Sequence, residues 1–83
     1  MTRRVTLLTT TSCALCEQAK GVLTDLARDF PLDVEEIDVG SDKGRVIADR
    51  AGMAFPPGVL LDGEPFSYGR LSERKLRRAL LRT

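Results

Sequence analysis

The order strand, helix, strand in the first half of the chain constrains the fold more than any other feature. Residues 5–9 are apolar and β-branched, which predicts a largely buried central strand. Ser12 is a good N-cap for a helix that begins at Cys13 and is closed by Pro31. Residues 33–39 predict a second, half-exposed strand, and their acidic side chains favour a sheet edge. A strand–helix–strand start implies parallel strands joined by a right-handed crossover.

The second half of the chain predicts a β-hairpin between two short helices. The first of these helices ends at Gly52, and Ser72 caps the last one. Between them, two short strands flank Asp62-Gly63, a dipeptide that suits a type I′ turn. Pro65 lacks the N–H that a central strand needs, so the second arm is expected at a sheet edge. The predicted order is therefore β-α-β-α-β-β-α, an α/β fold.

Two cysteines and the absence of histidine limit the chemistry that the chain can perform. With 83 residues, it is expected to form one domain over residues 1–83 with a small core. Cys13 and Cys16 close too short a loop to staple that core. Without histidine, Ser-His-Asp and Cys-His sites are excluded, and two cysteines supply half the ligands of a structural zinc site. The cysteine pair is the soft, nucleophilic chemistry that remains, and no metal is expected.

The charges nearly balance, with 13 Lys and Arg against 12 Asp and Glu, which argues against a general nucleic-acid binder. No apolar run reaches the roughly 18 residues of a membrane span, and no signal peptide is found, so a cytoplasmic protein without membrane contact is expected. The distribution is uneven, however. Six cations against Glu73 alone follow Gly69, and they predict a solvated helix face or a docking surface for an acidic partner: Arg70, Arg74, Lys75, Arg77, Arg78 and Arg82.

The segment Cys13-Ala14-Leu15-Cys16 sits after the first predicted strand and opens the first helix. The unpaired N–H groups and the dipole at a helix N-terminus stabilise an anion, here the Cys13 thiolate. Cys13 would be the exposed nucleophile and Cys16, one turn inside, the resolving thiol. This placement favours redox-active thiols over a spectator pair or half of a shared metal site. Glu17, on the same helix face, opposes thiolate formation if it lies close to Cys13.

Two features besides the CxxC support a resemblance to a known family. With Pro57 ahead of a predicted strand and Gly69 ahead of the last helix, the chain resembles a glutaredoxin, closest to the short bacterial glutaredoxin-like proteins of the thioredoxin superfamily. The resemblance covers essentially the whole chain and rests on residues 9–17, 55–59, 62–63 and 68–71. It implies a thioredoxin-like fold, in which a four-stranded mixed sheet is flanked by three helices. It also implies that Pro57 is cis and lies beside the CxxC, whereas the residues alone favour a trans Pro-Pro breaker.

The resemblance further implies a substrate groove around the cysteines, formed by Ser12, Leu15, Pro56, Pro57, Gly69 and Arg70. In the family, the residue before the cis proline pairs its backbone with an incoming thiol peptide. Here that residue is Pro56, which can offer only its carbonyl. Ala14-Leu15 replaces the familiar Pro-Tyr dipeptide, and Arg70 stands where the family's glutathione site has a second glycine. Thiol chemistry survives these changes, and glutathione specificity is weakened by them.

The expected function is thiol–disulfide exchange. Cys13 would attack a protein or mixed disulfide, Cys16 would resolve the intermediate, and Pro57 would shape the groove. No bound metal or prosthetic group is expected, with glutathione or another low-molecular-weight thiol as co-substrate. The expected partner is a disulfide-containing protein or such a thiol, met by a monomer. Two alternatives stay open: an iron–sulfur carrier in which two chains each give Cys13, and a redox-silent interaction domain that uses the Arg-rich last helix.

Overall fold

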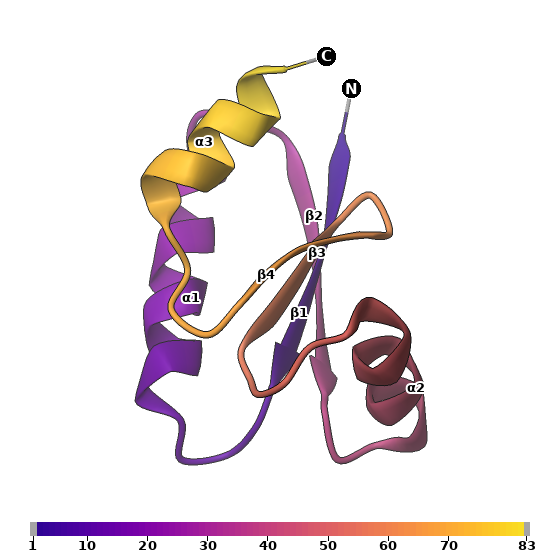
Figure 1. Ribbon diagram of the computed structural model, residues 1–83. Coiled ribbons are helices and arrows are strands. Elements are labelled where there is room, and N and C mark those ends of the chain that lie inside the picture. Colours follow the sequence, from indigo (N-terminus) through magenta and orange to yellow (C-terminus); the bar gives the residue numbers. More distant parts are fainter. Residues whose placement is uncertain (1, 83) are drawn as a thin grey trace.

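A four-stranded mixed sheet carries the fold, with α1 and α3 on one face and α2 on the other (Figure 1). The computed structural model describes residues 2–82. The predicted order of elements is confirmed. They are β1 (Arg3–Thr9), α1 (Ala14–Leu26), β2 (Leu32–Asp38), α2 (Asp42–Ala51), β3 (Gly58–Leu61), β4 (Glu64–Tyr68) and α3 (Glu73–Leu81).

The strand order in the sheet is β2-β1-β3-β4, which places β2 and β4 at the edges, as predicted. β1 pairs with β2 in parallel and with β3 antiparallel, and β3 and β4 form the hairpin. Asp62 and Gly63 have φ angles of 52° and 84°, both in the left-handed region that a type I′ turn requires. The predicted hairpin and the predicted parallel pair are therefore both confirmed.

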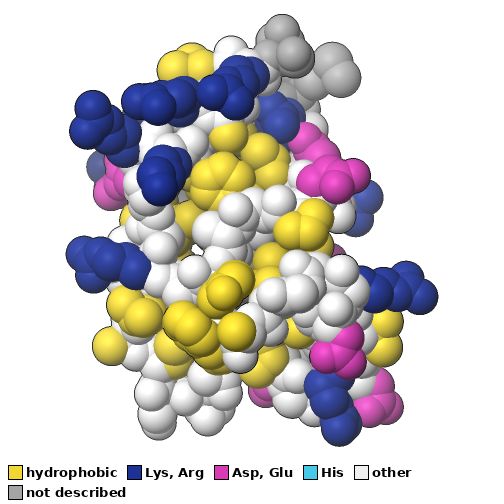
Figure 2. All heavy atoms as spheres, viewed as in Figure 1, with side chains coloured by type: hydrophobic (Ala, Val, Ile, Leu, Met, Phe, Trp, Pro, Cys, Tyr) yellow, Lys and Arg dark blue, Asp and Glu magenta, His cyan; other side chains and the backbone are white. Residues whose placement is uncertain are grey.

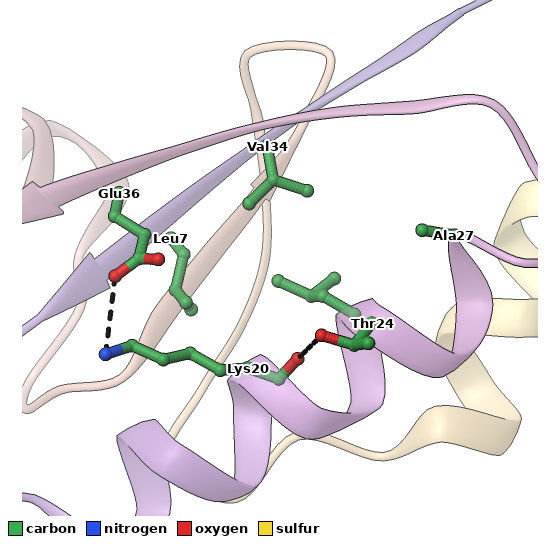
Figure 3. A pocket seen from close by; sticks show the side chains of 7 residues that line it. Leu7, Lys20, Thr24, Ala27, Val34 and Glu36 are labelled. Atoms are coloured by element: carbon green, nitrogen blue, oxygen red, sulfur yellow. Dashed lines mark hydrogen bonds and ion pairs between the residues drawn. The ribbon is translucent and has the colours of Figure 1, made fainter.

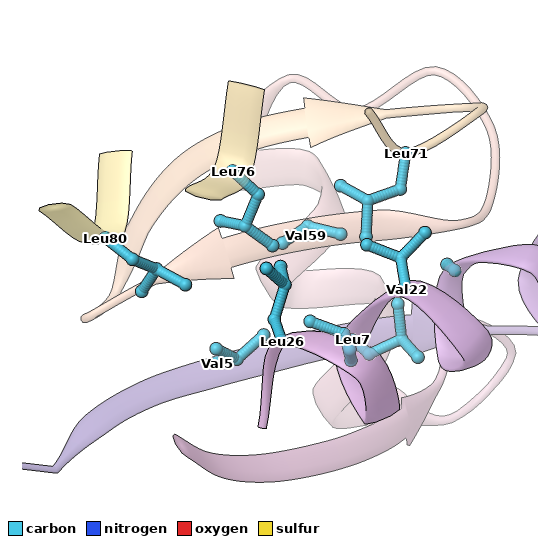
Figure 4. Close-up of a cluster of buried hydrophobic side chains, with 10 residues drawn as sticks. Val5, Leu7, Val22, Leu26, Val59, Leu71, Leu76 and Leu80 are labelled. Carbon is cyan, nitrogen blue, oxygen red and sulfur yellow. The ribbon is translucent and has the colours of Figure 1, made fainter. Parts of the chain in front are cut away.

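Alternating side chains of β1 build two cores, one on each face of the sheet. Val5 and Leu7 point toward α1 and α3, into the larger cluster shown in Figure 4. Leu8 points to the other face and packs with partly buried side chains of α2. None of these three side chains is more than 1% exposed. Because both faces of β1 are packed, its position in the sheet is fixed. The point at which the residues after Thr9 leave the sheet is therefore fixed as well.

Helix α1 differs from its prediction at both ends. Its N-cap is Cys13 and not Ser12, because the Cys13 side chain accepts the free N–H of Cys16 in the first turn while Ser12 has a left-handed φ of 52°. The helix ends at Leu26, well before Pro31, because the N–H groups of residues 28–29 bond to carbonyls three positions back and tighten the chain into turns.

The Asp62 carboxylate ties the tip of the hairpin to the start of β1. It accepts hydrogen bonds from the backbone N–H of Arg4 at 3.0 Å and from Nε of Arg3 at 2.5 Å. These donors, the Arg4 N–H first, stabilise the ionised carboxylate and hold the pKa of Asp62 below its usual value.

Asp62→Asn is expected to keep the turn, since Asn tolerates the left-handed conformation, and to lose the ion pair with Arg3. A carboxylate with a lowered folded-state pKa stabilises the fold above its unfolded pKa of about 3.8, and this contribution is lost as the pH falls through the lower folded-state value. Urea midpoints at neutral pH and in acid below the unfolded pKa measure the effect. Wild type is expected to lose more stability on acidification than the variant, and equal losses would contradict the role given to Asp62.

Two helical glycines offer a matched test of the packing. A Cβ on Gly21 in α1 would meet no atom within 4 Å, whereas a Cβ on Gly44 in α2 would overlap the backbone of Asp38. Gly21→Ala is expected to stabilise the protein by about 0.5–1 kcal/mol through helix propensity, and Gly44→Ala to destabilise it by about 1–3 kcal/mol. Urea denaturation of both variants measures the difference. A Gly44→Ala protein more stable than wild type would show that α2 does not pack as described.

Candidate active site

Cys13 and Cys16 form a disulfide where the chain passes from β1 into α1. Their Cα atoms lie 5.2 Å apart, and the backbone N–H of Cys16 donates to Sγ of Cys13 at 3.1 Å. Cys13 is half-buried, whereas Cys16 is 1% exposed and lies on the buried side of α1. Of the two, Cys13 is the cysteine that a second molecule can reach.

The loop before β3 lies at the same end of the sheet. Pro56 and Pro57 are joined by a cis peptide bond, as the resemblance implied, and Pro57 is fully buried. Gly58, the next residue, pairs with Leu8 near the end of β1. Since the cysteines also follow the end of β1, the strand register brings the disulfide and the cis proline to one end of the sheet (Figure 1).

The loop between β4 and α3 completes this end of the molecule. The Gly69 N–H donates to the Pro57 carbonyl at 2.8 Å, and Gly69 has a φ of 79°. A Cβ at this position would lie 3.0 Å from the ring of Phe55, so conformation and packing both require glycine. The backbone on one side of Arg70 is therefore held against the proline loop, while the Arg70 side chain is exposed.

The side chain of Gln18 fastens the same loop to the cysteine helix. Its Nε2 donates to the Leu71 carbonyl at 2.9 Å, and its Oε1 accepts from the Leu71 N–H at 3.2 Å. One side-chain amide thus satisfies both backbone groups of a buried residue. Gln18 was not among the predicted site residues, because its partner lies 53 positions away and a lone glutamine in a helix forms no motif.

The structure places the six predicted groove residues at different depths. Pro57 and Gly69 are buried and bonded to each other, so they shape the loops from within. The other four remain accessible, with Leu15 and Pro56 half-buried and Ser12 and Arg70 exposed.

An aromatic pair beside the cis proline was not predicted as part of the site. Phe55 and Tyr68 are 53% and 46% exposed, and their rings meet edge to face with centroids 5.1 Å apart. Figure 2 shows hydrophobic side chains gathered in the lower part of the face, over the loop that leads into β3. This surface can hold an apolar part of a bound molecule. The sequence feature that could have indicated it is that each aromatic residue stands next to a residue that interrupts regular structure, Phe55 next to Pro56 and Tyr68 next to Gly69.

Lys20 joins the cysteine helix to the edge of the sheet. Its Nζ lies 3.1 Å from Oε2 of Glu17 and 3.4 Å from Oε1 of Glu36, beside a groove of about 320 Å³ between α1 and β2 (Figure 3). The hydrogen bond and charge of Glu17, followed by the charge of Glu36, raise the pKa of Lys20. The Glu17 carboxylate, which was expected to oppose an anion at Cys13, is therefore paired with a cation.

Within residues 2–82, no group of three or more His, Cys, Asp or Glu side chains is arranged to hold a metal ion. Over the same range, none of the helices has the length and apolar character needed to cross a membrane.

Gln18→Leu is expected to lower the stability by about 1–3 kcal/mol, because it leaves the N–H and carbonyl of Leu71 unpaired. Gln18→Glu is the matched variant, since it keeps an acceptor for the Leu71 N–H but cannot donate to the Leu71 carbonyl. Its stability should fall between that of wild type and that of Gln18→Leu. Urea denaturation measures both. Hydrogen exchange at the Leu71 amide should be faster in Gln18→Leu, and an unchanged rate would show that the tie does not hold the loop.

Comparisons with known proteins support the arrangement as a whole. Residues 4–81 match the family model described as Glutaredoxin-like domain (DUF836). No curated protein matches the chain. Among solved structures, a mutant thioredoxin from Halobacterium salinarum NRC-1 has a TM-score of 0.70 and 24% identity, over 94% of this chain and 71% of that one. The oxidized form of mitochondrial thioredoxin 3 from Saccharomyces cerevisiae has a TM-score of 0.69 and 22% identity, over 94% and 76%.

These structural matches show the fold alone at such identities, and that fold is thioredoxin-like, as predicted. The family match spans nearly the whole chain and includes both cysteines, both prolines of the cis bond and the loop that Gln18 holds. The chain belongs to the glutaredoxin-like domain family.

Proposed function

We propose that this protein is a thiol–disulfide oxidoreductase that reduces protein or mixed disulfides through Cys13 and Cys16. The observation that carries the proposal is a disulfide at the start of a helix in which one cysteine is accessible and the other is buried. Membership of the glutaredoxin-like family and the thioredoxin-like fold support it. The cis Pro57 loop and the exposed ring of Phe55 beside it offer a surface on which a substrate can lie.

The reduced protein carries out the exchange in two steps. The Cys13 thiolate attacks one sulfur of the substrate disulfide, which forms an intermolecular disulfide and releases the other substrate sulfur as a thiolate that takes up a proton. The Cys16 thiol loses its proton to solvent, attacks Sγ of Cys13 and releases the second substrate thiol. Two electrons and two protons pass to the substrate, and the protein is left with the intramolecular disulfide of the present structure.

Electrostatics at the helix end activate Cys13 in this proposal, since the sequence contains no histidine. The Cys16 N–H already donates to Sγ of Cys13, and the N-terminal end of the α1 dipole favours an anion at the same atom. The ion pair between Glu17 and Lys20 limits the repulsion from a carboxylate one helical turn away.

The two thiols carry the electrons themselves, so the reaction needs no resident metal or prosthetic group. A low-molecular-weight thiol such as glutathione, or a dithiol protein, reduces the Cys13–Cys16 disulfide after each cycle. We place this activity in a monomer that works in a reducing compartment such as the cytoplasm, where the dithiol form is maintained.

Cys13→Ser is expected to abolish the reduction of insulin and of hydroxyethyl disulfide, because the attacking sulfur is lost. Cys16→Ser is expected to accumulate a covalent adduct with protein substrates, because nothing resolves the mixed disulfide. Turnover assays measure the first result, and mass spectrometry of the adduct measures the second.

Arg50→Ala serves as the control, since Arg50 is exposed on α2, which covers the face of the sheet opposite α1, and its turnover should match that of wild type. If Cys13→Ser retained turnover, the proposed mechanism, in which Cys13 is the attacking thiol, would be wrong. A visible absorption band in anaerobically purified protein that disappears in Cys13→Ser, without disulfide reductase activity, would instead identify an iron–sulfur carrier.

A further inference from the structure

The outward side of α3 carries cations that have no carboxylate partner within the described range, residues 2–82. Leu76 and Leu80 form the buried side of this helix. Arg77 is neutralised by Asp29 at 2.9 Å and by Glu73 at 3.7 Å. The remaining cations of α3 and its two flanks are exposed and take part in none of the ion pairs of that range: Arg70, Arg74, Lys75, Arg78 and Arg82.

These five residues are here called the cationic face, and three of them, Arg74, Lys75 and Arg78, lie on α3 itself. Arg74 and Arg78 are four positions apart and so lie on the same side of α3, about 6 Å from each other along its axis. Arg70 and Arg82 flank the helix, since Arg70 precedes its N-cap and Arg82 is its C-cap. Figure 2 shows Lys and Arg side chains gathered over α3 at the top of the molecule.

The cationic face begins at the candidate active site. Arg70 lies between Gly69, whose N–H donates to the Pro57 carbonyl, and Leu71, whose backbone is held by Gln18 two positions after Cys16. The backbone that carries Arg70 is therefore held beside the loops at this end of the sheet, and α3 leads away from them (Figure 1).

We propose that the cationic face binds an acidic segment of the protein whose disulfide Cys13 attacks. This inference rests on the proposed function and names its substrate class, a protein disulfide with carboxylates to one side. Uncompensated cations beside a reactive group attract such a partner and orient it before contact. The nine residues of α3 extend about 14 Å, which suits a short acidic segment.

A protein partner fits this surface better than a nucleic acid does. Aromatic side chains, on which bases stack, are absent from residues 70–82. Acidic residues of β2 occupy another edge of the same small molecule, Glu35 and Glu36 among them, and the net charge is +1, so a long polyanion would meet repulsion beyond α3.

The test compares two synthetic peptides that contain the same intramolecular disulfide and differ in one flank, a run of Glu or a run of Gln of equal length. At low salt, wild type is expected to reduce the Glu peptide with a kcat/KM about tenfold higher than that for the Gln peptide, and added NaCl should remove this preference. Arg74→Glu/Arg78→Glu is expected to abolish the preference, and Arg74→Gln/Arg78→Gln to reduce it. Both should reduce hydroxyethyl disulfide at the wild-type rate, which shows that the fold and the cysteines are intact.

The matched control is Arg45→Glu/Arg50→Glu, which makes the same change in net charge on α2, on the other face of the sheet. This control variant should keep the preference for the Glu peptide. If it lost the preference as fully as Arg74→Glu/Arg78→Glu does, the effect would come from net charge and the proposal would be overturned. Equal kcat/KM of wild type for the two peptides at low salt would overturn it as well.

A Cys13→Ser/Cys16→Ser protein separates docking from disulfide exchange, because it can bind a peptide but cannot reduce one. The measurement is its binding of a fluorescent Glu peptide that lacks cysteine. Salt-sensitive binding of this peptide that is lost in Arg74→Glu/Arg78→Glu would support docking at the cationic face. If wild type failed to reduce hydroxyethyl disulfide, that result would contradict only the proposed function and would leave this docking result standing. Tighter binding of a single-stranded oligonucleotide of equal charge would overturn the proposal and assign the face to nucleic acid.

Discussion

Burial of β1 on both faces is the constraint on which the rest of the structure depends. Val5 and Leu7 belong to the core under α1 and α3, and Leu8 belongs to the core under α2. A shift of one residue in the register would exchange these two sets, so the packing fixes the register. Because Leu8 pairs with Gly58, the same register brings the cysteine loop and the cis proline loop to one end of the sheet. The cores and the candidate site are thus two results of one strand alignment.

A third loop, between β4 and α3, is held both by the core, which Leu71 enters, and by polar contacts. The Gly69 N–H binds the Pro57 carbonyl, and the Gln18 amide binds both backbone groups of Leu71. The first contact closes the two ends of the β3–β4 hairpin, and the second spans 53 positions. Together they connect the cysteine helix, the proline loop and the start of α3. Backbone groups held in this way give the candidate site a fixed shape.

The parts of the fold that the sequence could predict are those governed by local physics. Asp62-Gly63 specifies its turn through two left-handed residues, and Ser72 caps α3 as predicted, by accepting the Lys75 N–H. The cap of α1 was predicted one residue too early, because a cysteine sulfur took the place usually filled by a hydroxyl. The cis state of Pro57 was accessible through family resemblance, since a Pro-Pro sequence alone favours trans. Gln18 depends on a distant backbone, which no local pattern reports.

The pair of prolines at the site limits how any polypeptide can be recognised there. Neither Pro56 nor Pro57 has an N–H, and the Pro57 carbonyl already accepts the Gly69 N–H. The Pro56 carbonyl is the one backbone group of this dipeptide without a competing partner inside the loop. A bound strand normally gains register from a ladder of alternating donors and acceptors, and a single acceptor supplies none. A polypeptide lying over this dipeptide could therefore gain one backbone hydrogen bond from it, which leaves side-chain and charge contacts to align the polypeptide there.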